Sequence, residues 1–348
     1  MKFGLFFLCE QPPWQSQRSA YHDAIDQAVY ADALGFDAVW IAEHHFSEYG
    51  IVPDVAVLAG ALAQRVTRMR IGTAVSILPF IHPIRAAESF AMVDVLSDGR
   101  LDLGVGRGYQ PTEFAGFGLS MDESRERFDE SLDMIRRAWT EDRLTYEGRF
   151  YQARDVHVTP KPVQKPHPPI WVAAVSPESF ELAARKGYRF LSAPSITPPA
   201  LMAQSYDKYR RIWREAGHPA DELEIPALHF TYVGASGPRA RREPEQCVMW
   251  YFQTFARLVA AERPDEVSPE YRFYAKAREH LQSVDYGHLF EDVLLFGDIE
   301  RVVDRITFLR DELGVTYLLN WMNFGGLENE LARDSLRRFA EKVIPRFR

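Results

Sequence analysis

The chain alternates strand-like and helix-like segments from one end to the other. The strand-like segments are short apolar runs, and each is followed by a segment with apolar residues at helical spacing. The strand-like runs cover 2–8, 37–42, 69–78, 101–105, 170–174, 189–193, 227–233 and 315–321. The helical segments cover about 18–35, 53–67, 83–97, 122–140, 177–186, 199–216, 299–313 and 328–341. Such alternation predicts parallel strands with helical crossovers, and eight repeats favour a closed barrel over an open, doubly wound sheet. We therefore predict an α/β fold, a (β/α)8 TIM barrel with insertions.

The length of 348 residues leaves room for insertions, because such a barrel needs only about 250 residues. Three segments account for most of the excess: a hairpin at 144–158, a proline-rich connector from Pro160 to Pro169, and 234–292. The alternation resumes directly after the connector. We therefore expect one domain over 1–348, with a variable insert at about 234–292.

Charge and cysteine content exclude several classes of protein. The 41 basic and 49 acidic residues give a net charge of −8, which argues against nucleic acid or an anionic membrane as a partner. Cys9 and Cys247 are too few for a disulfide framework or a cysteine-based zinc site. The apolar run from Phe3 to Leu8 is too short for a signal peptide, and no small-residue cleavage site follows it. We read it as a buried first strand and expect a cytoplasmic protein.

Common nucleotide and metal motifs are missing. The glycines between Gly104 and Gly108 lack the spacing of a dinucleotide fingerprint. The chain also has no Walker loop, no nucleophile elbow and no His-Glu-x-x-His zinc helix. We therefore expect neither a nicotinamide bound through a Rossmann unit nor a metal ion.

The most informative local motif is Glu43-His44-His45-Phe46, which directly follows the strand at 37–42. Barrel enzymes place their chemistry at this carboxyl end of the strands. Histidine suits general acid–base work, and neighbours on an extended segment point to opposite sides. One histidine would thus face the pocket while the other supports it. The alternative is that both are structural and bond to backbone carbonyls.

Two further strand ends are candidate anion sites. Arg107 lies between Gly106 and Gly108 and offers a bidentate fork for phosphate; the alternative is a tight turn with a surface arginine. Ser176 to Ser179 open a helix after the strand at 170–174, where amides and hydroxyls meet the positive end of the helix dipole. The alternative, a simple N-cap at Ser176, is compatible with phosphate binding.

Several of these motifs belong to a longer ordered series. The series consists of Met1-Lys2-Phe3-Gly4, Gly35-Phe36-Asp37, Glu43-His44-His45-Phe46, Gly72-Thr73-Ala74, Leu78-Pro79, His82-Pro83, Ser97-Asp98-Gly99-Arg100, Gly104 to Gly108 and Ser124-Arg125. In this order the motifs resemble the bacterial luciferase-like flavin monooxygenase family. The resemblance covers about residues 1–190 and 293–344 and is weak in 234–292.

This resemblance implies a barrel that binds reduced FMN at its C-terminal mouth. The flavin would react with O2 to a C4a-hydroperoxide that oxygenates a small, apolar substrate, and a separate reductase would supply FMNH2. His44 matches the histidine beside the reacting flavin, and His45 would support it. The implied cofactor-binding residues are Arg107, Arg125, Ser176 and Ser179 at the phosphate, Ala74 and Val75 as a non-proline cis peptide under the ring, and Tyr109 and Val175 beside the flavin.

Two departures from the light-emitting enzyme argue against light emission and an aldehyde substrate. Gly106 replaces a reactive cysteine, and Val175 replaces an acid. Two other functions remain open: an F420-dependent oxidoreductase that transfers hydride on the same fold, and a non-catalytic flavin-binding subunit. The presence of His44 and of the phosphate residues counts against the second. Family analogy also implies a homodimer.

Overall fold

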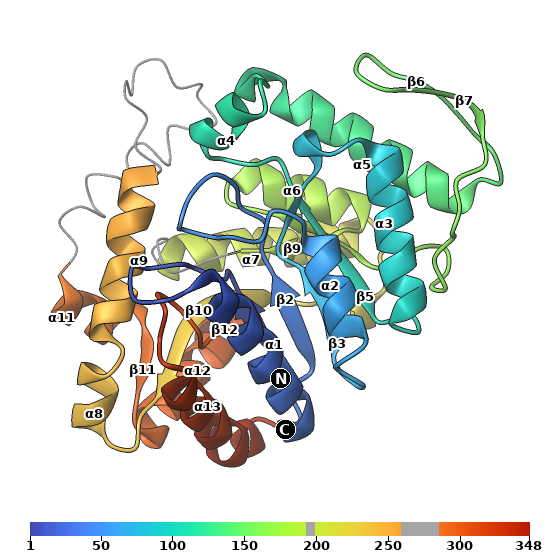
Figure 1. Ribbon diagram of the computed structural model, residues 1–348. Coiled ribbons are helices and arrows are strands. Elements are labelled where there is room, and N and C mark those ends of the chain that lie inside the picture. Colours follow the sequence, from blue (N-terminus) through green and yellow to red (C-terminus); the bar gives the residue numbers. More distant parts are fainter. Residues whose placement is uncertain (193–198, 259–284) are drawn as a thin grey trace.

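Eight parallel strands form a barrel at the centre of the protein (Figure 1). The computed structural model describes residues 1–192, 199–258 and 285–348. The barrel strands are β1 (Lys2–Phe7), β2 (Ala38–Ile41), β3 (Arg70–Thr73), β5 (Leu101–Gly106), β8 (Ile170–Ala173), β9 (Arg189–Leu191), β10 (Pro226–Val233) and β12 (Tyr317–Trp321). β12 lies between β10 and β1, and the Leu228 amide donates to the Ser192 carbonyl at 3.1 Å, which joins β10 to the end of β9. The predicted fold class and all eight predicted strands are confirmed.

The barrel interior is filled by large side chains. Alternate residues of the strands point inward, and Phe6, Trp40, Trp171, Phe230 and Trp321 belong to one buried cluster. The indole rings of Trp40 and Trp171 meet edge to face at 5.0 Å. The remaining strand residues face outward into a second cluster that includes the apolar faces of the helices. The barrel is therefore a packed core, and only its ends can hold a ligand.

The eight predicted helices surround this barrel. They are α1 (Gln17–Leu34), α2 (Val55–Ala63), α3 (Pro83–Leu96), α5 (Ser124–Thr140), α6 (Pro177–Lys186), α7 (Pro199–Glu215), α12 (Ile299–Leu313) and α13 (Asn329–Arg338). Gly35 ends α1 at φ 95°, a left-handed conformation that favours glycine. α2 is shorter than predicted at both ends; Asp54 caps it by accepting hydrogen bonds from the amides of Ala56 and Val57.

Additional elements lie between the βα units. The predicted hairpin is present as β6 (Leu144–Glu147) and β7 (Gln152–Val156). The strand predicted at 69–78 is split into β3 and β4 (Ser76–Ile77). Elements that the sequence pattern did not predict are α4 (Pro111–Gly116), α8 (Gly237–Arg242), α9 (Glu245–Leu258), α11 (Tyr286–His288) and β11 (Leu295–Gly297). Short helical turns occur at Leu78–Phe80, Met121–Glu123, Ala220–Glu222, Leu289–Val293, Phe339–Val343 and Ile344–Arg346. Residues 259–284 of the predicted insert at about 234–292 lie outside the described residues.

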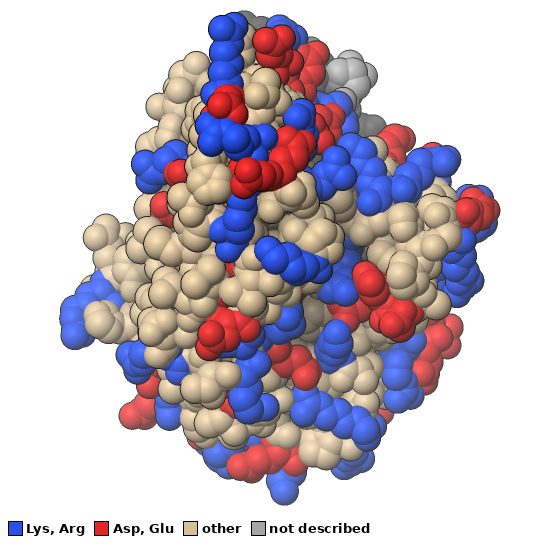
Figure 2. Space-filling model, turned by 90° about the vertical axis from the view of Figure 1, so that its right-hand side faces the viewer, with Lys and Arg blue, Asp and Glu red and all other residues tan. Residues whose placement is uncertain are grey.

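The surface carries both signs of charge. On the face shown in Figure 2, basic and acidic side chains are interspersed, and an area without charged side chains lies between them. Among the described residues, no helix is both long enough and apolar enough to cross a membrane.

Candidate active site

The buried polar residues after β2 lie at the carboxyl end of the barrel strands. Glu43, His44 and His45 are each less than 10% exposed. The His44 ring meets the rings of Tyr49 and Tyr109 edge to face, at 4.8 and 5.7 Å. The His45 ring instead lies among phenylalanines, 4.8 Å from Phe117 and 5.6 Å from Phe80. The two histidines thus face different surroundings.

The partners of His44 come from α4. Its Nδ1 lies 2.9 Å from Oε1 of Glu113 and 3.1 Å from Nε2 of Gln110. The same Glu113 oxygen accepts a hydrogen bond from the His45 amide at 3.0 Å. Glu113 and Gln110 are both fully buried. Sequence reasoning missed them because α4 is only six residues long, although Pro111 at its first position is a helix-start signal.

Glu43 links His45 to the turn after β3. Its Oε1 lies 3.2 Å from Nε2 of His45, and its Oε2 accepts from the Ser76 hydroxyl at 3.1 Å and the Ile77 amide at 3.2 Å. Burial raises the pKa of Glu43, and the hydrogen bonds from His45, Ile77 and Ser76 oppose that rise. The Glu43 carboxyl therefore ties the end of β2 to the next strand.

That turn contains the two residues predicted to lie under the flavin ring. The peptide bond between Ala74 and Val75 is cis, as the resemblance implies. Both residues are half-buried and pack against the inner cluster of the barrel. A Cβ at Gly106 would stand 2.5 Å from Cγ2 of Val75, so the bare glycine makes room for the valine.

Three tyrosines form one wall of the candidate site. The Tyr109 hydroxyl donates to Tyr49 at 3.3 Å, and the hydroxyls of Tyr49 and Tyr251 lie 2.9 Å apart. Burial raises the pKa of all three phenols, so they stay protonated at neutral pH. Tyr251 also stacks on Phe255 at 5.9 Å. Both residues belong to α9, which lies in the predicted insert and which sequence reasoning missed. The aromatic residues of this segment at helical spacing are the signal that indicates a helix.

The predicted phosphate residues follow two neighbouring strands. Val105 of β5 pairs with Val172 of β8, so the loops that carry Arg107 and Ser176 emerge beside each other. Arg107 and Arg125 are half-buried, and Arg125 is the second residue of α5. Ser176 caps the ten-residue α6. The loops after β5 and β8 thus bring Arg107 and the N-terminus of α6 to the same end of the barrel.

Ser179 and Val175 complete this loop. The Ser179 amide donates to the Ser176 hydroxyl at 3.4 Å, and the Ser179 hydroxyl lies 3.1 Å from the Val175 amide, which donates to it. Val175 is 47% exposed. The hydroxyl of Ser179 therefore shapes the turn before α6.

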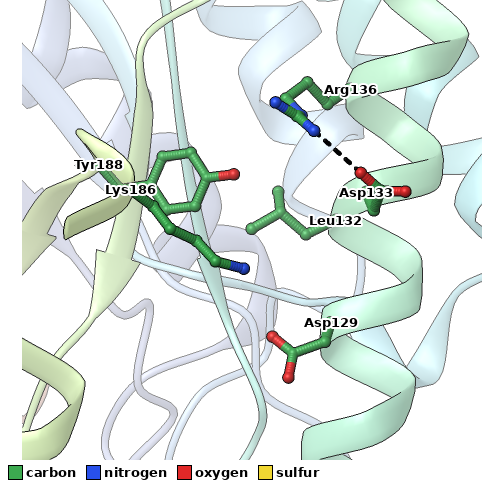
Figure 3. A pocket seen from close by; sticks show the side chains of 6 residues that line it. All are labelled: Asp129, Leu132, Asp133, Arg136, Lys186 and Tyr188. Carbon is green, nitrogen blue, oxygen red and sulfur yellow. Dashed lines mark hydrogen bonds and ion pairs between the residues drawn. The ribbon is translucent and has the colours of Figure 1, made fainter. Parts of the chain in front are cut away.

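A separate cavity lies outside the barrel. It has a volume of about 270 Å³ and is lined by Asp129, Leu132, Asp133, Arg136, Lys186 and Tyr188 (Figure 3). Arg136 is paired with Asp133 at 3.0 Å. Lys186 and Tyr188 precede β9, so the cavity is at the amino end of that strand and contains none of the predicted site residues. Within the described part of the chain, no three His, Cys, Asp or Glu side chains converge as metal ligands.

A closed parallel barrel with buried histidine, carboxyl and phenol groups at the carboxyl ends of its strands defines an α/β-barrel enzyme. The chain belongs to the luciferase-like monooxygenase family, whose model matches residues 1–317. The predicted family is therefore confirmed, and the protein is a flavin-dependent monooxygenase.

Individual relatives match over nearly the whole chain. The uncharacterized protein y4vJ of Sinorhizobium fredii is 38% identical over 99% of this chain and 97% of its own length. The oxygenase component of the flavin-dependent trigonelline monooxygenase of Acinetobacter baylyi is 28% identical over 100% and 96%. The crystal structure of the monooxygenase RslO1 from Streptomyces bottropensis is 32% identical, covers both chains completely and has a TM-score of 0.87.

Proposed function

We propose that this protein is the oxygenase component of a two-component system, which uses O2 and reduced FMN from a separate reductase to oxygenate a small organic molecule. The observation that carries the proposal is His44, held by Glu113 at the barrel mouth in a chain of this family. The relative from Acinetobacter baylyi is named as an oxygenase component, which supports a separate reductase that supplies the reduced flavin.

The residues at the mouth fit FMN. Arg107, Arg125 and the N-terminus of α6 would hold the phosphate, with Ser176 and Ser179 as hydroxyl donors. Ala74, Val75, Tyr109 and Val175 would border the ring. Reduced FMN, when bound, supplies the electrons that activate O2. His44 would hold or move a proton beside the ring, and His45 would support the strand end that positions it.

The substrate we propose is small and mainly apolar. Phe230 and Trp321 stack at 4.3 Å inside the barrel, and Tyr251 meets both rings within 4.9 Å. The phenol groups of Tyr49 and Tyr251 add a few polar atoms to this aromatic wall. An aromatic wall of this composition at the barrel mouth favours an apolar molecule that carries one or two polar groups.

We also propose a homodimer. Apolar side chains on α2 and α3 are unusually exposed: Val57 is 71% exposed, Met92 53%, Val95 42% and Leu96 43%. Exposed apolar side chains on two helices that pack against each other are typical of an interface. Sedimentation of the wild type against Met92→Lys tests this, because the variant should sediment as a monomer; a monomeric wild type would contradict the proposal.

The function is tested by mixing the protein anaerobically with reduced FMN and then with O2. Bound FMN should oxidise with kinetics different from those of free flavin, and His44→Ala should lose substrate oxygenation. His22→Ala, at an exposed position on α1, is the matched control. Preference for F420 over FMN in a binding competition would favour the hydride-transfer alternative. FMN binding without any effect on its reaction with O2 would favour the non-catalytic subunit.

A further inference from the structure

We propose that Glu113 is a positioning residue that holds His44 in the tautomer protonated on Nδ1, which leaves Nε2 as the nitrogen that exchanges protons at the barrel mouth. The catalytic use of Nε2 rests on the proposed function. The tautomer itself is a property of the resting protein and can be measured without turnover.

The proton on Nδ1 follows from the two contacts of one oxygen. A backbone amide can only donate, so Oε1 of Glu113, 3.0 Å from the His45 amide, is an acceptor there. The same Oε1 lies 2.9 Å from Nδ1 of His44, and the fitting donor is the ring N–H. A proton on Oε2 would not change this, since Oε1 would still be the carbonyl oxygen that accepts.

Burial indicates that Glu113 acts through His44. Glu113 is completely buried, and its Oε2 has no hydrogen-bond partner within the described residues. A substrate at the mouth cannot touch such a group. The His44 side chain, by contrast, is 8% exposed. Nε2 is the His44 nitrogen without a hydrogen bond in the described part of the chain, so it is the atom left for a ligand.

Gln110 is the second neighbour of Nδ1 and fits this tautomer in one of its two amide orientations. Its Nε2 lies 3.1 Å from Nδ1 of His44, whereas its buried Oε1 has no partner among the described residues. An amide NH2 that faces a ring N–H is unfavourable, because both groups are donors. Rotation of the Gln110 side-chain amide by about 180° would place Oε1 beside Nδ1 instead. Gln110 would then be a second acceptor for the same proton.

The neighbouring acid cannot replace Glu113. The Glu43 carboxyl already contacts His45, Ser76 and Ile77. Each histidine thus has its own carboxyl partner, and removal of Glu113 leaves His44 without one. In that case the ring should prefer the proton on Nε2, the usual preference of a free imidazole.

The test is NMR of protein labelled with 15N-histidine, with the His44 signals assigned by their loss in His44→Gln. The wild type at pH 8 should show a protonated Nδ1 and an unprotonated Nε2. Glu113→Leu removes the carboxylate acceptor. The Gln110 amide N–H, 3.1 Å from Nδ1, can then donate to that nitrogen, so the proton should shift to Nε2. Glu113→Gln keeps an acceptor oxygen and should retain the wild-type tautomer, which makes it the matched control.

Turnover provides the second readout. Glu113→Leu should lower kcat by at least about tenfold, and Glu113→Gln should recover most of the loss. In a His44→Gln background, Glu113→Leu should cause no further loss, because both changes disable one unit. An Nε2-protonated wild type, an unchanged tautomer in Glu113→Leu, or additive losses would overturn the proposal. If Glu113→Leu does not fold, the wild type and Glu113→Gln still decide the tautomer. The expected tautomer without oxygenation would refute only the proposed function.

Discussion

Glu10 offers a direct test of how burial controls a charge in this protein. It follows β1 and is 3% exposed, and its Oε1 has no hydrogen-bond partner among the described residues. Burial raises the pKa of Glu10 from 4.5 to about 8, although its own amide and that of Gly325 donate hydrogen bonds that oppose the rise. The carboxyl is therefore mostly neutral in the folded protein at pH 7 and ionised in the unfolded chain.

The direction of the pH dependence follows from this difference. Between pH 4.5 and 8 the folded state keeps a proton that the unfolded state has released. The stabilising contribution of Glu10 is therefore complete below pH 4.5 and is lost as the pH rises through about 8. One pH unit corresponds to about 1.4 kcal/mol, so the full loss is on the order of 5 kcal/mol.

Urea unfolding of Glu10→Gln from pH 5.5 to 9 measures this contribution. The glutamine variant lacks the titration, so its free energy of unfolding relative to the wild type should rise by about 1.4 kcal/mol per pH unit and level off above pH 8. Glu222→Gln, at an exposed position, is the control and should show no such slope. A difference between Glu10→Gln and the wild type that does not change with pH would refute the reasoning, because Glu10 would then be ionised in the folded state.

Three substitutions test packing in the barrel and at the mouth. Gly72→Ala places a Cβ 2.2 Å from Cε3 of Trp40 and should lower the free energy of unfolding by about 3 kcal/mol or more; wild-type stability in urea would contradict this. Tyr317→Phe removes the hydroxyl that accepts from Nε1 of Trp40 at 2.7 Å and should cost about 1–3 kcal/mol in the same assay, with a loss near zero counting against the bond. Gly106→Ala would press on Val75 and should weaken FMN binding by about tenfold, or about 1.4 kcal/mol. Val75→Ala should restore that affinity, and failure of the double variant to do so would show that the two side chains do not compete for space.

The fold could be predicted because its signals are local. Each barrel strand is a short apolar run, and each major helix carries a period of apolar residues that ends at a glycine, proline or cap, as α1 does at Gly35. The elements that the sequence did not predict lack such local signals. α4 is too short to show a period, and β11 is three residues long and pairs with Thr231 to Val233 at the end of β10.

The candidate site could be predicted only in part. Its position at a strand end marks a residue as a candidate, but it does not identify the side chains that this residue contacts. His44 and Arg107 could be chosen from the ends of their strands. Glu113 contacts His44 across 69 positions of sequence, and Tyr251 contacts Tyr49 across 202. These partners depend on where α4 and α9 pack, which tertiary structure decides.

The position of β12 has a consequence for how the barrel can be assembled. This strand is the last of the eight in sequence, yet it pairs with β10 through Pro226 to Phe230 and with β1 through Lys2 to Phe6. A ribosome must therefore release residues up to Trp321 before β1 and β10 can pair along the edges that face β12. Until then the nascent chain exposes two strand edges, which are templates for pairing with other chains. Truncation before β12 should consequently yield an aggregating chain rather than a smaller barrel.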